Sequence, residues 1–142
     1  MLKNIPKILS PDLMKTLMEM GHGDEIILAD GNFPAATHAK RLIRNDGLFI
    51  PELLEAFIPY FPLDQSVEHP VVVMRLTPSE KAPEIWETYR RILKEHGDPF
   101  VDFEYVERYS FYERAKHAFA IVITSDQSFK GNLLLKKGVV RE

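Results

Sequence analysis

A histidine flanked by two glycines is the residue in this sequence best suited to move protons. His22 lies between Gly21 and Gly23, and an imidazole can gain or lose a proton near neutral pH. Because glycine has no Cβ atom, both neighbours leave room for a ligand or a second backbone to approach the ring. The same pattern also fits a solvent-exposed turn after a helix, so the local sequence leaves both interpretations open.

A carboxylate follows at the far end of the next apolar run. Asp30 ends residues 25–30, and strand ends followed by loops are common binding sites in α/β proteins. Asp30 could equally accept backbone hydrogen bonds in a turn over residues 30–34. A five-residue strand would separate His22 from Asp30 by about 17 Å. The two could then share one small ligand only if the His22 loop folded back, or at an interface between two copies of the chain.

Two further segments carry side chains that could bind a polar ligand. Arg108 ends a strand candidate, and its guanidinium could hold a hydroxyl or carboxylate or form a surface ion pair. Lys130, Gly131 and Asn132 precede an apolar strand candidate, and the amide of Asn132 can both donate and accept hydrogen bonds. A plain turn explains the second segment equally well.

Most other chemistries lack their motifs. The five histidines show neither HExxH nor paired metal-ligand spacing, so we expect no metal site. No GxGxxG or GxxxxGK[ST] element follows a strand, which argues against nucleotide cofactors. The chain has no cysteine and no GxSxG elbow, so covalent catalysis has no obvious nucleophile. Proton transfer on a small polar ligand, without a cofactor, remains.

Composition limits the partners and the location. The net charge is −3, and lysine and arginine are dispersed along the chain, so we expect no nucleic-acid partner. The longest apolar runs are far shorter than the roughly 18 residues that span a bilayer. The first residues contain no secretory signal pattern, and we therefore expect a cytoplasmic protein.

The elements that must position these residues alternate between helix and strand. Ser10 and Pro11 predict the start of a helix, which Gly21 would end in a left-handed conformation. We expect further helices within 50–61, 83–97 and 110–118, and strands within 25–30, 39–44, 69–77, 103–109, 119–126 and 132–138. We therefore predict a single domain over residues 1–142, a three-layer α/β/α sandwich with a mixed, mostly parallel sheet.

Two details of this arrangement can also be predicted. The last two strand candidates are joined by only a few residues, so part of the sheet should be antiparallel. Three loop aromatics, Phe33, Tyr60 and Phe129, are expected to be exposed, where a neighbouring subunit could cover them.

Long stretches of the chain resemble a known family. LMEMGHGDEIILADGNFPA, residues 17–35, is similar to the N-terminal signature of the fucose mutarotase and ribose pyranase family. FYERAKHAFAIVITSD, residues 111–126, and GNLLLKKG, residues 131–138, resemble its fucose branch. The likeness extends over about residues 2–140, and it favours a functional role for His22.

The resemblance implies an enzyme that interconverts the α and β anomers of a free monosaccharide, most simply L-fucose. The pyranose ring opens and recloses by acid–base catalysis without a cofactor. In such proteins the counterpart of His22 is the proton donor, and those of Asp30, Arg108, Lys130, Gly131 and Asn132 bind the sugar. The resemblance also implies a ring-shaped homodecamer with its sites at subunit interfaces.

One position departs from the family pattern. Members commonly have tyrosine where this chain has Lys130, so a charged, flexible side chain replaces an aromatic hydroxyl. A sugar-binding or regulatory module on the same scaffold is therefore an alternative, as is a mutarotase or pyranase that prefers another sugar such as D-ribose. A nucleotide-binding domain would rest on fold class alone.

Overall fold

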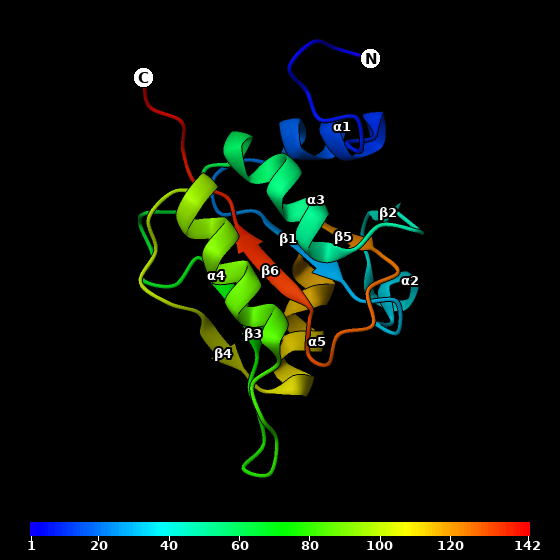
Figure 1. Ribbon diagram of the computed structural model, residues 1–142, viewed down its shortest axis with the longest axis vertical. Coiled ribbons are helices and arrows are strands. Elements are labelled where there is room, and N and C mark those ends of the chain that lie inside the picture. Colours follow the sequence, from blue (N-terminus) through cyan, green and yellow to red (C-terminus); the bar gives the residue numbers. More distant parts are fainter.

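The computed structural model describes residues 1–142 and contains one six-stranded mixed sheet (Figure 1). The strand order is β2-β5-β1-β6-β3-β4. β6 runs antiparallel to both of its neighbours, whereas the remaining pairs are parallel. The strands are β1 (Glu25–Ala29), β2 (Leu42–Arg44), β3 (Val71–Met74), β4 (Glu104–Val106), β5 (Ala120–Ile123) and β6 (Leu133–Lys136).

Helices cover both faces of this sheet, which confirms the predicted three-layer α/β/α arrangement (Figure 1). The larger core lies beneath α1 (Pro11–Glu19), α3 (Ile50–Phe57) with the following 3-10 turn Ile58–Tyr60, and α4 (Glu84–His96). The smaller core lies beneath α2 (Ala35–His38) and α5 (Arg108–His117).

The central strands are apolar throughout because each strand feeds both cores. In β1, Ile26 and Leu28 belong to the larger core, whereas Ile27 and Ala29 belong to the smaller one. Successive side chains of a strand point to opposite faces, so a strand covered by helices on both sides needs apolar residues at every position. Burial on both faces fixes β1, and with it the positions of the loops at its two ends.

The first helix begins where the sequence predicts, but the turn after it differs from the prediction. The Ser10 hydroxyl accepts a hydrogen bond from the Leu13 N–H, as expected for an N-cap. α1 ends at Glu19, and the prediction that Gly21 adopts a left-handed conformation is wrong. The positive φ, +88°, belongs to Gly23 instead, whose N–H donates to the carbonyl of Lys137 and ties this turn to the end of β6.

The junction before α5 also differs from the prediction. β4 ends at Val106, and Arg108 is the first residue of α5 and not the last of a strand. The Glu107 carboxylate accepts hydrogen bonds from the N–H groups of Tyr109 and Ser110. This side-chain cap satisfies the first amides of the helix and overrides the alternating pattern of the sequence.

Two expectations about neighbours need correction. The short β5–β6 connection does give an antiparallel relationship, but β1 lies between these strands, so they are not paired with each other. Phe33 is only 6% exposed because its ring packs against Phe111 and Tyr112, whereas Tyr60 and Phe129 are exposed as predicted.

None of the helices is both long and apolar enough to cross a membrane.

Candidate active site

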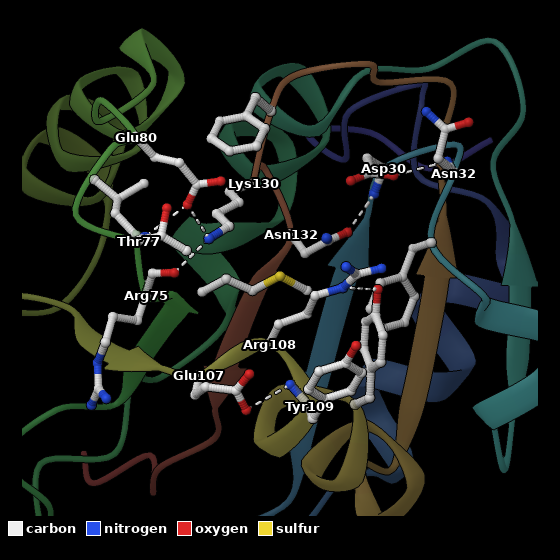
Figure 2. Close-up of a pocket in the computed structure, with 15 residues that line it drawn as sticks. Asp30, Asn32, Arg75, Thr77, Glu80, Glu107, Arg108, Tyr109, Lys130 and Asn132 are labelled. Atoms are coloured by element: carbon white, nitrogen blue, oxygen red, sulfur yellow. Dashed lines mark hydrogen bonds and ion pairs between the residues drawn. The ribbon is translucent and has the colours of Figure 1, made fainter.

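An open cavity of about 620 Å³ lies at the edge of the sheet where the parallel strands end (Figure 2). Four of the predicted ligand-binding residues line it, namely Asp30, Arg108, Lys130 and Asn132. Asp30 directly follows β1 and Asn132 directly precedes antiparallel β6, so the two meet at the same edge. The carboxyl ends of parallel strands converge there, and this edge is the common location of ligand sites in α/β sheets.

A hydrogen bond between main chain and side chain fixes Asp30 and Asn132 relative to each other. The Asp30 N–H donates to Asn132 Oδ1 at 2.8 Å, which leaves the amide NH2 of buried Asn132 as a donor for another acceptor. The Asp30 carboxylate accepts the N–H of Asn32 at 2.8 Å. The cavity therefore presents a carboxylate and an amide donor, both held by short hydrogen bonds.

The Asp30 carboxyl is more basic than a typical aspartate. Partial burial raises its pKa, and the nearby Asp126 carboxylate adds to this effect. Hydrogen bonds from the backbone of Asn32 and Phe33 and from Asn132 oppose the rise only in part. A carboxylate with a raised pKa is a strong acceptor for a ligand hydroxyl.

Two tyrosines orient Arg108, which also lines the cavity. Its guanidinium carbon lies 5.7 Å from the ring centre of Tyr109 and 5.5 Å from that of Tyr112, within the range of cation–π attraction. Its Nε donates to the Tyr112 hydroxyl at 3.2 Å, and this hydrogen bond raises the pKa of Arg108. The guanidinium remains charged and keeps further N–H groups for a ligand.

The ammonium of Lys130 is already engaged by other parts of the protein. Lys130 Nζ donates to Glu80 Oε1 and to the carbonyl oxygen of Arg75, both at 2.6 Å. Figure 2 shows its side chain reaching towards Glu80 on the loop that follows β3. Of the three N–H groups of the ammonium, two therefore already have acceptors within the protein.

The backbone of the same segment is held by α4. Trp86 Nε1 donates to the carbonyl of Lys130 at 2.9 Å, and the hydroxyl of buried Tyr89 donates to the carbonyl of Gly131 at 2.5 Å. Gly131 does not line the cavity. A Cβ atom at Gly131 would lie 3.1 Å from the Ser128 carbonyl oxygen, so glycine allows the chain to turn tightly here.

His22 does not lie in this cavity. It precedes β1 whereas Asp30 follows it, so the two occupy opposite ends of the strand, as the spacing predicts. The imidazole is 52% exposed, and its Nε2 lies 3.1 Å from Oδ1 of the nearly buried Asp64. Asp64 Oδ1 also accepts the N–H and the hydroxyl of Ser66, at 3.0 and 2.7 Å.

Asp64 is an ionised anchor for the imidazole. Burial alone would raise its pKa, but hydrogen bonds from Ser66, followed by that from His22, hold the pKa of the carboxyl below its usual value. Since an ionised carboxylate only accepts hydrogen bonds, His22 Nε2 carries the proton of this contact. The other ring nitrogen, Nδ1, is then the atom of His22 available for exchanging protons with a ligand.

We expect Asp64→Asn to destabilise the fold by about 1–3 kcal/mol at pH 7, because buried hydrogen bonds to a charged group are lost. The folded-state pKa lies below the usual 3.8, so the stabilisation is complete above about pH 4 and disappears as pH falls through the lowered pKa. Urea denaturation of both proteins between about pH 7 and pH 2 measures this convergence. Ser66→Ala keeps the carboxylate and should lose less, and equal stability of Asp64→Asn and wild type at pH 7 would refute the role.

Sequence reasoning missed several residues of these two sites. Tyr112 lies four residues after Arg108, which is the spacing of neighbours on a helix, and became visible only once α5 was known to begin at Arg108. Glu80 carries no local signal of its contact with Lys130. Asp64 had a weak one, because an aspartate two residues before Ser66 is typical of a turn. No group of three potential metal-ligating side chains comes together in the structure.

The chain is similar over nearly its full length to proteins of known type. The model of the RbsD / FucU transport protein family matches residues 3–140. A fucose mutarotase from Mus musculus is 49% identical over 146 residues, which cover 98% of this chain and 95% of the relative.

Solved structures give the same result. A fucose mutarotase from Streptococcus pneumoniae, crystallised in complex with L-fucose, is 51% identical with a TM-score of 0.94, covering 99% of this chain and 100% of that one. FucU from Bifidobacterium longum is 42% identical with a TM-score of 0.91, covering 96% and 100%. The fold is thus shared with proteins that span the same length.

Proposed function

The chain belongs to the RbsD / FucU family, and from this membership and the geometry of its cavity we infer that it is an isomerase that interconverts the α and β anomers of L-fucose. The observation that carries this conclusion is the 51% identity, over nearly the whole of both chains, with the mutarotase crystallised with L-fucose. The open polar cavity with Asp30, Arg108 and Asn132 supplies the hydroxyl-binding groups that such a substrate needs.

The reaction requires proton transfers and changes only the configuration of the sugar at its anomeric carbon, not its composition. One group removes the proton of the anomeric hydroxyl while another protonates the ring oxygen, and the bond between the anomeric carbon and the ring oxygen breaks. Rotation about the bond beside the resulting aldehyde exposes its other face. The ring hydroxyl then attacks that face, the two protons return, and the opposite anomer forms.

We propose that the residues of the cavity bind and orient the sugar. The raised pKa of Asp30 suits a carboxylate that accepts hydrogen bonds from sugar hydroxyls, and the amide NH2 of Asn132, which has two N–H groups, suits a donor to a sugar oxygen. Arg108 supplies a cation that Tyr112 holds in place. Gly131 contributes by its backbone turn, and Lys130 shapes the wall of the cavity.

We propose His22 as the proton donor, reached across a subunit interface. Within one chain the imidazole and the cavity lie at opposite ends of β1. If the His22 end of one copy docks beside the cavity of a neighbour, the exposed imidazole can reach the sugar bound there. Asp64 would keep Nε2 protonated and leave Nδ1 to exchange the proton.

The surface next to His22 supports such an interface. The Gly23 N–H is bonded to the carbonyl of Lys137, and Lys137 lines an apolar hollow together with Met18, Tyr60 and Val140. Met18 is 81% exposed and Val140 is 64% exposed. Exposed apolar groups gathered in this way are typical of contact surfaces. We propose a homo-oligomer, a ring-shaped decamer as the family resemblance implies, and light scattering of the purified protein measures its size.

Anomer exchange measured by NMR on an equilibrium solution of L-fucose tests the activity. We expect exchange between the α and β signals of L-fucose to be faster with the protein than with buffer alone. The acceleration over buffer should be smaller for D-ribose than for L-fucose. A larger acceleration for D-ribose would identify a ribose-preferring enzyme. Calorimetric binding of fucose without faster exchange would favour the sugar-binding module.

We propose a cytoplasmic location on the composition of the chain.

A further inference from the structure

One wall of the sugar cavity is a loop that few contacts hold in place. Residues 75–83 connect β3 to α4, and Arg75, Thr77 and Glu80 of this loop line the cavity. The tip is closed on itself, since the Thr77 N–H donates to Glu80 Oε1 at 2.7 Å and the Glu80 N–H donates to the Thr77 carbonyl at 3.0 Å. Partly buried Leu76, near the base of the loop, packs against the larger core. Most of the other loop residues are exposed, so residues 77–82 at the tip have little packing of their own.

Lys130 makes the one polar link between this tip and the rest of the protein. Between residues 76 and 82, the only hydrogen bond or ion pair to a residue outside the loop is that of Glu80 with Lys130. The same ammonium binds the Arg75 carbonyl at the base of the loop. The two charged side chains are 12% and 26% exposed, so solvent screens their attraction less than it screens a surface pair.

The backbone of Lys130 is itself rigidly placed. Its φ is +47°, a left-handed backbone conformation that is uncommon for residues other than glycine. The indole of Trp86 and the hydroxyl of Tyr89 hold the carbonyls of Lys130 and of the next residue. Because α4 fixes the base of the lysine, its ammonium is a fixed point to which the loop can be fastened.

We propose that Lys130 and Glu80 form a latch that holds the 75–83 loop as a wall of the sugar cavity, so that Lys130 acts as a positioning residue and not by contacting the sugar. The proposal rests on the function inferred above, because it assumes that this cavity binds the sugar. The latch stabilises the arrangement of the loop that binds the substrate, whereas the proposed proton donor, His22, is not part of this loop and does not contact the latch. Breaking it should therefore raise KM and leave kcat nearly unchanged.

Hydrogen exchange of the sugar-free protein tests the latch independently of activity. In both Glu80→Gln and Lys130→Met, we expect the amides of residues 75–83 to exchange roughly fivefold faster or more, because the loop opens more often. Each change should also raise the KM for anomer exchange several-fold, with kcat within about twofold of wild type. The double variant should resemble either single variant, since both remove the same interaction.

A matched control separates the latch from the general effect of losing an ion pair. Lys15 and Glu19 form a pair of the same 2.6 Å length on the exposed face of α1, and Glu19→Gln should change neither loop exchange nor KM. Unchanged loop exchange in Glu80→Gln would overturn the latch. A raised KM in Lys130→Met alone would show instead that the ammonium contacts the sugar. If the loop amides exchange faster in the variants but the wild-type protein does not accelerate anomer exchange, the latch is supported and the proposed function is refuted.

Discussion

His22→Ala is expected to lower the kcat of anomer exchange by a factor of about 10²–10⁴, which is the usual contribution of a positioned general acid or base. The imidazole is half exposed in a turn before β1, and its removal leaves both cores intact. We therefore expect cooperative unfolding to be preserved. Exchange NMR of L-fucose at saturating concentration measures the loss, and thermal denaturation confirms the fold.

A second histidine provides the control for this variant. His96 is also partly exposed and lies 3.3 Å from a carboxylate, Glu55, but it does not line the sugar cavity. His96→Ala should exchange fucose anomers at the wild-type rate. If His22→Ala retains full kcat, the proton passes through a different group and the proposed role of His22 fails.

Subunit complementation can show whether His22 acts across an interface. In co-expressed chains carrying either His22→Ala or Asp30→Asn, a shared site is intact only when the first variant supplies Asp30 and the second supplies His22. Random assembly then restores about a quarter of the sites, although each variant alone is nearly inactive. Activity no higher than that of the separate variants would place both residues in the same subunit's site.

Asp30→Asn is expected to lower kcat/KM roughly 100-fold, because a charged acceptor for sugar hydroxyls becomes a neutral amide. The new side chain has nearly the same shape, and its Oδ1 can still accept the Asn32 N–H. The backbone link from residue 30 to Asn132 Oδ1 is also retained. Initial rates of anomer exchange at fucose concentrations below KM measure the change.

The same substitution should leave the fold at least as stable as wild type at neutral pH. Burial raises the folded-state pKa of Asp30, so its ionised form opposes folding at pH 7 and this effect fades as pH falls towards the usual value of 3.8. Asp46→Asn removes an exposed carboxylate paired with Arg44 and should leave the activity unchanged. Wild-type kcat/KM in Asp30→Asn would contradict its role in binding.

The sequence by itself determined the six strands, four of the five α-helices and four of the 15 residues that line the cavity. Apolar runs that feed two cores predicted the central strands, and Ser10 with Pro11 predicted the first helix start, because periodicity and capping act over a few residues. The ends of these elements carried the polar groups, so Asp30, Arg108, Lys130 and Asn132 could be named before their positions were known. Local patterns failed at the start of α5, where the alternating sequence predicted a strand but the Glu107 side chain caps a helix.

Only the tertiary structure decided which of these residues meet. Asp30 and Asn132 are 102 positions apart and are joined because β6 pairs with β1, a strand order that no local pattern specifies. The contact of Lys130 with Glu80 depends on a loop 50 positions away. His22 and Asp64 likewise come together across 42 positions, at the opposite end of β1 from the cavity. Contacts over such separations follow from the packing of the whole sheet, whereas sequence patterns report only the backbone within a few residues.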